Sequence, residues 1–164
     1  MSKEVLILTT IGALAIITLL STTALSRFSG ILSPPLTVAN VWALNITGTE
    51  GPDTLKGTAD KDTIRGYGGD DIISGLGGND AIRGGRGDDT IHGDEGKDRI
   101  RGDTGKDVIF GDNGNDVLIG GPGDDTLTGG PGKDTFNCGA GIDTVTDFDR
   151  VINDTVTASC ENVR

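Results

Sequence analysis

Acidic side chains recur at a fixed interval along more than half of the chain. With Gly48 as position 1, residues 48–146 divide into eleven consecutive blocks of nine, and position 6 is Asp in every block. Carboxylates are ligands for hard cations, and Ca²⁺ takes about six to eight oxygen ligands at about 2.3–2.6 Å. The spacing therefore predicts a series of divalent-cation sites. The eleven aspartates are Asp53, Asp62, Asp71, Asp80, Asp89, Asp98, Asp107, Asp116, Asp125, Asp134 and Asp143.

Three other positions of the nine-residue block are nearly constant. Position 8 is apolar in all eleven blocks, from Leu55 to Val145. Position 1 is Gly except at Cys138, and position 4 is Gly except at Asp60. Glycine permits positive φ and leaves the backbone carbonyl uncovered. Neither chance nor simple low complexity keeps one phase over 99 residues without an insertion.

This pattern resembles the RTX, or haemolysin-type, calcium-binding repeat, whose consensus is Gly-Gly-x-Gly-x-Asp-x-apolar-x. The residues that carry the resemblance include the blocks at 84–92 and 120–128, and the repeats cover about 60% of the chain. The resemblance implies an all-β fold, a right-handed parallel β-roll. This is a β-solenoid of 18 residues per coil, in which six residues of each block form a turn and three form a short strand. In seven blocks Thr, Tyr, Leu or Asp replaces the second glycine of the consensus.

The β-roll would stack the aspartates in two columns, because alternate blocks lie on opposite sides of a coil. Two carboxylates about 5 Å apart repel by roughly 3 kcal/mol at an effective dielectric constant near 20. A cation between adjacent coils reverses the sign. Five gaps in one column and four in the other give at most nine Ca²⁺ ions. Backbone carbonyls are expected to complete the ligand sets, at Gly66, Gly69, Gly75, Gly78, Gly84, Gly87, Gly93, Gly96, Gly102, Gly105, Gly111, Gly114, Gly120, Gly123, Gly129 and Gly132.

The charge of the repeats agrees with a cation as partner. Residues 48–146 contain 20 acidic and 10 basic residues, so they carry −10 of the net −11. This acidic balance argues against nucleic acid, which is recognised through basic surfaces. The eleven inward side chains bury too little apolar surface to order 99 residues alone, so we expect folding to be coupled to ion binding.

The N-terminal segment suggests export. Residues 5–25 contain no charged side chain. We expect residues 1–26 to form an apolar helix that serves as a cleaved signal peptide or as an uncleaved membrane anchor. The membrane is then a partner only through this segment. Residues 27–47 are predicted to be a linker, and Asn45 and Asn153 begin possible glycosylation sequons.

The last residues leave the nine-residue phase and are predicted to cap the roll. We expect residues 147–164 to fold back over the last coil, with Phe148, Val151, Ile152 and Val156 covering its apolar end. Cys138 and Cys160 are the two cysteines of the chain. They are expected to form a disulfide that holds this cap, while two free thiols or a bond to a second molecule remain as alternatives.

These features predict a secreted or cell-surface calcium-binding protein that is not an enzyme. No catalytic residue is identified: His92 is the only histidine, it occupies an outward strand position, and the chain has no H-E-x-x-H motif. The alternative is an accessory domain, or remnant, of an exported enzyme. Ice binding is disfavoured because position 5 carries Pro, Lys, Asp and Asn rather than a uniform row of Thr or Asn.

Overall fold

The computed structural model describes residues 10–11, 14–15, 43–148, 154–157 and 159–164. The chain divides into two units, residues 1–39 and 40–164, which are considered separately. In the first, β1 (Thr10–Ile11) pairs antiparallel with β2 (Leu14–Ala15). The rest of the expected N-terminal helix lies outside the described residues. Among the residues that are described, no helix is long and apolar enough to cross a membrane.

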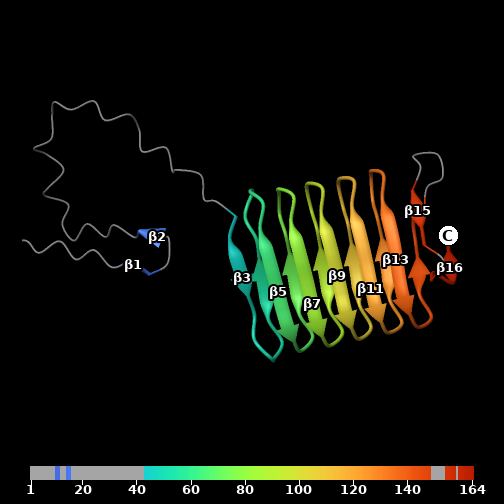
Figure 1. The fold of residues 1–164 in the computed structure, drawn as a ribbon, viewed down its shortest axis with the longest axis horizontal. Helices are drawn as coiled ribbons and strands as arrows, with labels where there is room; N and C mark the ends of the chain where they lie inside the picture. The colour runs from blue at the N-terminus through green and yellow to red at the C-terminus, as the bar shows by residue number, and fades with distance from the viewer. Residues whose placement is uncertain (1–9, 12–13, 16–42, 149–153, 158) are drawn as a thin grey trace, which may run out of the picture. The chain divides into compact units, whose positions relative to one another are not determined.

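The second unit is a β-solenoid of two parallel, seven-stranded sheets (Figure 1). Consecutive strands of the chain alternate between the sheets. One sheet contains β3 (Asn45–Thr47), β5 (Thr63–Gly68), β7 (Ala81–Arg86), β9 (Arg99–Thr104), β11 (Val117–Pro122), β13 (Thr135–Ala140) and β15 (Thr155–Val156). The other contains β4 (Thr54–Lys56), β6 (Ile72–Ser74), β8 (Thr90–His92), β10 (Val108–Phe110), β12 (Thr126–Thr128), β14 (Thr144–Val145) and β16 (Asn162–Val163).

The strand register shows that one coil contains 18 residues. Ile64 lies opposite Ile82, and Ile82 lies opposite Ile100. The other sheet has the same offset, with Ile73 opposite Ile91 and Ile91 opposite Ile109. These findings confirm the predicted parallel β-solenoid with 18-residue coils.

The position-8 side chains form the core between the two sheets. From Ile64 to Val145 every one of them is at most 3% exposed. Their neighbours at positions 7 and 9 point away from the core, since successive side chains of a strand face opposite ways. Leu55, at the N-terminal end of the roll, is partly buried and packs against this core.

From the third block on, position 2 of the repeat has positive φ even where it is not glycine. Tyr67 has a φ of 80° and Leu76 a φ of 73°. Asp94, Asp103 and Asp112 have φ values of 69°, 82° and 65°. Asp enters this region more easily than most residues, whereas a bulky side chain there is strained. The turn geometry is therefore imposed by the stacked coils and not by the residue at position 2.

Both ends of the roll extend beyond the eleven blocks. Strand β3 lies in the segment expected to be a linker, pairs with β5 and packs Ile46 against the core. At the other end β15 and β16 add one strand to each sheet. Phe148 and Val156 pack against the core there, as does Cys160. Val151 and Ile152, which were expected in the same cap, lie outside the described residues.

Candidate metal centre

The aspartates of position 6 form two continuous hydrogen-bonded columns. From Asp71 to Asp143, the Oδ1 atom of each accepts the backbone N–H of the aspartate eighteen residues earlier. Asp71 Oδ1 thus accepts from Asp53 N at 2.8 Å, and Asp89 Oδ1 accepts from Asp71 N at 2.8 Å. The ten aspartates from Asp62 to Asp143 are at most 2% exposed. One oxygen of each carboxylate is therefore committed to holding adjacent coils in register.

The second oxygen of most of these carboxylates has no hydrogen-bond partner. Within the described part of the chain, the buried Oδ2 atoms without one belong to nine aspartates. A buried polar group without a partner costs free energy, and a buried charge costs more. Such an atom requires a cation or a proton. The nine are Asp71, Asp80, Asp89, Asp98, Asp107, Asp116, Asp125, Asp134 and Asp143.

Except at Asp143, whose block begins with Cys138, each unpaired Oδ2 faces a space that only glycine leaves open. A Cβ atom built on Gly84 would lie 2.2 Å from Asp89 Oδ2 and 2.8 Å from the carbonyl oxygen of Gly102 in the next coil. On Gly93 it would lie 2.6 Å from both Asp98 Oδ2 and the Gly111 carbonyl oxygen. Position 1 is therefore glycine because a carboxylate and a carbonyl oxygen of the next coil converge above its Cα. This donor set suits a hard cation.

The position-4 glycines form a separate stack. Gly96 has a φ of 144°, and a Cβ on it would lie 1.5 Å from the carbonyl oxygen of Gly78. The same built atom would lie 3.4 Å from Asp98 Oδ1. These expected carbonyl ligands thus face the position-4 glycine of the following coil and the hydrogen-bonded side of the aspartate column.

Two threonines satisfy the first aspartate of each column. Thr49 donates to Asp53 Oδ2 through its backbone N–H at 2.6 Å and through Oγ1 at 2.9 Å. Thr58 makes the same two bonds to Asp62 Oδ2, at 2.6 and 2.9 Å. Threonine occupies position 2 in the first two blocks alone, and this was the only signal for the role in the sequence.

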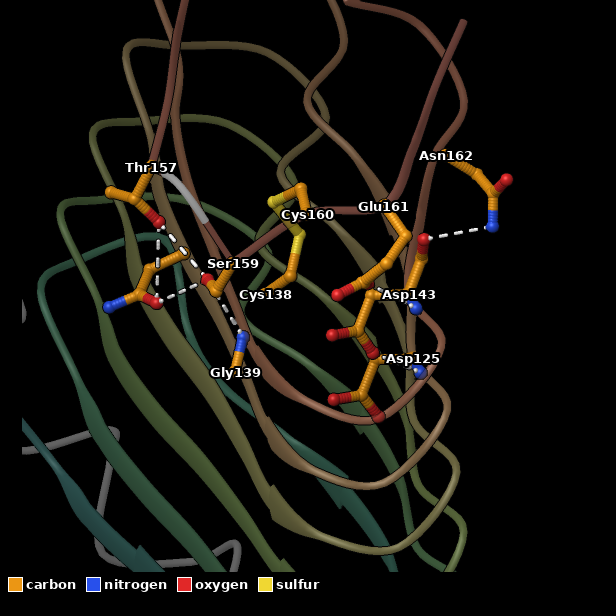
Figure 2. The surroundings of a disulfide bond; sticks show 10 residues. Asp125, Cys138, Gly139, Asp143, Thr157, Ser159, Cys160, Glu161 and Asn162 are labelled. Carbon is orange, nitrogen blue, oxygen red and sulfur yellow. Dashed lines mark hydrogen bonds between the residues drawn. A yellow bond between two sulfur atoms is a disulfide. The ribbon is translucent and has the colours of Figure 1, made fainter.

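The other end of each column is closed by an acid from outside the repeats. Asp154 Oδ1 accepts the N–H of Asp134 at 2.9 Å, and Glu161 Oε2 accepts that of Asp143 at 3.0 Å. Figure 2 shows Glu161 continuing the column of Asp125 and Asp143, beside the disulfide of Cys138 and Cys160. The Cα atoms of the two cysteines are 5.2 Å apart. The role of Glu161 was not predicted, although its spacing of eighteen residues from Asp143 is that of the columns.

Burial raises the pKa of the column carboxylates. Desolvation is the largest cause, and the charges of neighbouring aspartates add to it. The backbone hydrogen bond from the preceding coil opposes both. The pKa rises to about 7 for Asp107 and Asp116. It rises to about 6 for Asp80, Asp89, Asp98, Asp125 and Asp134.

The acids at position 2 serve the outer surface and not the columns. Asp94 Oδ2 accepts from Ser74 Oγ at 2.6 Å, and Asp112 Oδ2 lies 2.9 Å from His92 Nδ1. His92 also stacks on Phe110, with ring centroids 4.4 Å apart. Among the described residues, no three side chains of His, Cys, Asp or Glu gather around one point. A metal site in the described part of the chain would therefore need backbone carbonyls among its ligands.

Comparison with known proteins identifies the repeat. The family model for the RTX calcium-binding nonapeptide repeat (four copies) matches residues 47–82, 74–109 and 110–145. No curated protein and no solved structure matches the chain. The matched residues contain the columns described above.

Proposed function

Because the chain belongs to the RTX calcium-binding nonapeptide repeat family, we propose that its roll folds around Ca²⁺ and acts outside the cell as a structural or binding module without catalytic activity. Calcium binding follows from the family. To this we add the extracellular location, the absence of catalysis and the coupling of folding to the ion. The observation that carries it is the row of buried Oδ2 atoms that have no partner.

We call the space between a position-1 glycine and the Oδ2 atom of its block a cradle. Seven interior cradles are the proposed ion sites. In each, the Oδ2 of an aspartate from Asp71 to Asp125 lies against the position-1 glycine of its own block. The first cradle of each column is excluded because Thr49 and Thr58 already donate to its carboxylate. The last is excluded in one column because Cys138 places a Cβ where other blocks have none. In the other column, the last cradle is that of Gly129 and Asp134. It is excluded because the Asp147 carboxylate already binds there, to the N–H groups of Gly129 and Gly130 at 2.8 and 2.7 Å.

The donor set favours calcium over other divalent cations. Carboxylate and carbonyl oxygens are ligands for hard ions, and several such oxygens suit the high coordination number of Ca²⁺. Mg²⁺ requires a tight octahedron and retains several of its waters. Zn²⁺ prefers Cys and His, and the only two cysteines of the chain form the disulfide.

Two features of the chain support the extracellular location. The uncharged segment at residues 5–25 is typical of a signal peptide or an anchor, and a disulfide is typical of oxidising compartments. The alternative remains an accessory domain of an exported enzyme. Removal of the uncharged segment from the mature protein, detected by N-terminal sequencing, would distinguish a cleaved signal from an anchor.

Circular dichroism tests the coupling of folding to calcium. In chelator we expect little β structure, and titration with Ca²⁺ should produce it cooperatively at about 10⁻⁴–10⁻³ M, the range of extracellular calcium modules. Mg²⁺ over the same range is the control and should not replace Ca²⁺. A chelated sample with the full β signal at neutral pH would contradict the proposal.

A further inference from the structure

All five arginines of the repeat region lie on or beside one face of one sheet. Arg65, Arg83 and Arg101 are direct partners in the register of β5, β7 and β9. Arg99 lies on β9, and Arg86 ends β7. We call these five residues the arginine face. All five side chains are exposed, although the repeats around them carry a net charge of −10.

The arginine face keeps positive charge that its own acids do not neutralise. Asp103 pairs with both Arg83 and Arg101, and Glu50 lies 3.6 Å from Arg86. Burial opposes ionisation of Asp103, yet the hydrogen bonds from the two guanidinium groups hold its pKa below the ordinary value. Arg65 and Arg99 have no acidic partner within the described ranges. Two carboxylates thus serve five guanidinium groups.

A groove of about 380 Å³ runs beside these arginines. Its lining includes Arg65, Arg83, Arg86 and Arg101, together with Tyr67. The Tyr67 side chain is 48% exposed although its backbone has a φ of 80°. The groove therefore combines an exposed aromatic ring with a row of guanidinium groups.

We propose that the arginine face binds an extended acidic polysaccharide through carboxylate or sulfate groups. A guanidinium group binds either anion through two parallel hydrogen bonds. The strand spacing sets Arg65, Arg83 and Arg101 at intervals of about 4.8 Å, which presents successive donors to a linear chain. Tyr67 offers an apolar ring to the C–H face of a sugar.

A nucleic acid fits this face less well. Single strands are bound by several aromatic rings on which successive bases stack, and Tyr67 is the one aromatic residue that lines the described groove. Domains that recognise nucleic acid are strongly basic, whereas this chain has a pI near 4.3. Polysaccharides contain the hydroxyl groups and sugar-ring surfaces that the groove can contact.

Calcium would control this binding, and in this respect the inference rests on the proposed function. The calcium-free roll carries −10 and repels a polyanion over the distance set by ionic strength. Five bound Ca²⁺ ions already cancel that charge, and seven reverse its sign. The same ions order the strands that place the five arginines together.

The test is binding of the full chain to labelled dextran sulfate and to hyaluronate, which carry sulfate and carboxylate respectively, with neutral dextran as control. In millimolar Ca²⁺, with folding verified by circular dichroism, we expect at least one of the two acidic polymers to bind and the neutral one not to. In chelator at equal ionic strength binding should be lost. The polymer that binds identifies the anion.

Matched variants separate the arginine face from total charge. Arg65→Gln with Arg99→Gln should weaken binding about tenfold, or about 1.4 kcal/mol. Lys97→Gln with Lys106→Gln removes equal charge from position 5 and should leave it nearly unchanged. Asp103→Asn frees Arg83 and Arg101 and should tighten binding.

Three outcomes would overturn the inference alone. The first is a folded, calcium-loaded chain that binds neither acidic polymer. The others are tighter binding of a single-stranded oligonucleotide and an equal loss of binding in the lysine variant. A chain that stays unfolded in calcium overturns the proposed function and this inference together.

Discussion

At the scale of single residues, the two oxygens of each column aspartate have different environments. Asp89 Oδ1 accepts the N–H of Asp71, while Asp89 Oδ2 is buried without a partner. The first oxygen fixes the coil spacing, and the second is available to an ion. The adjacent Asp88 is exposed, and its Oδ1 accepts the N–H of Lys106 at 2.7 Å. Two neighbouring aspartates of equal charge thus have separate tasks.

Asp89→Asn should weaken calcium binding, whereas Asp88→Asn should not. The amide at position 89 keeps an acceptor for Asp71 N but removes the charge from the cradle. We expect the calcium midpoint of folding to rise about tenfold, or about 1.4 kcal/mol. Asn replaces Asp88 without loss, since Asn79 and Asn115 make the equivalent bond to Lys97 and Lys133 at 2.8 Å. Equal midpoints for the two variants would show that position 6 does not hold the ion.

Gly84→Ala should fill a cradle. Its Cβ would lie 2.2 Å from Asp89 Oδ2 and 2.8 Å from the Gly102 carbonyl oxygen, closer than real contacts allow. We expect a stability loss of about 2 kcal/mol or more in calcium, measured by urea unfolding, because overpacking and lost ligation add. Gly77→Ala is the control, since its nearest neighbour would be 3.5 Å away. The idea fails if both variants unfold at the same urea concentration.

The sequence was sufficient to predict the aspartate columns and the core, because one residue type at one position repeats through every coil. It was not sufficient at the ends. Thr49 and Thr58 occupy a position where the consensus has glycine, and only the structure shows that they satisfy Asp53 and Asp62. Asp154 lies twenty residues after Asp134 rather than eighteen. An irregular spacing of this kind has no signal in a strict repeat.

At the scale of the elements, the two seven-stranded sheets owe their regularity to the 18-residue coil and their limits to the end segments. Strand β3 belongs to the roll although position 6 of its block is Leu44, because Ile46 still supplies an apolar side chain at position 8. Leu44 N also donates to Asp62 Oδ1 at 2.8 Å. The apolar position, more than the aspartate, decides where a strand forms.

The disulfide should stabilise the C-terminal strands. Replacing Cys138 and Cys160 together by Ser removes a cross-link that closes a loop of 22 residues. We expect the calcium-loaded protein to lose about 3 kcal/mol of unfolding free energy. Hydrogen exchange should rise first in β15 and β16, whereas β7 and β8 serve as the internal control. Uniform loss of protection in all strands would contradict a local role.

At the scale of the whole molecule, protons and the proposed Ca²⁺ ions would compete for the same carboxylates. The folded-state pKa of Asp107 and Asp116 is about 7, above the ordinary value of 3.8, because burial disfavours the charged form. Without calcium, the folded roll therefore binds more protons than the unfolded chain between these values. The stability that these groups contribute to the calcium-free roll is fully present below about pH 4 and is lost as the pH rises through 6 to 7.

Acidification should therefore act in opposite directions with and without calcium. In chelator, β structure and the urea midpoint should be greater at about pH 5 than at about pH 7.5. In calcium, the midpoint for Ca²⁺ should move to higher concentration at the lower pH, because the ligands must be deprotonated. Circular dichroism measures both quantities. A calcium midpoint that does not depend on pH would exclude the buried aspartates as ligands.

The hydrogen bonds of the columns all run in one direction, and this makes the two ends of the roll unequal. Each aspartate donates its N–H to the carboxylate of a later coil, so every coil is completed by chain that follows it. Coils can be removed from the N-terminal end without exposing such a donor. Truncation before Glu161 instead leaves the N–H of Asp143 without its acceptor. During synthesis, therefore, the C-terminal end of each column stays open until Asp154 or Glu161 has been made.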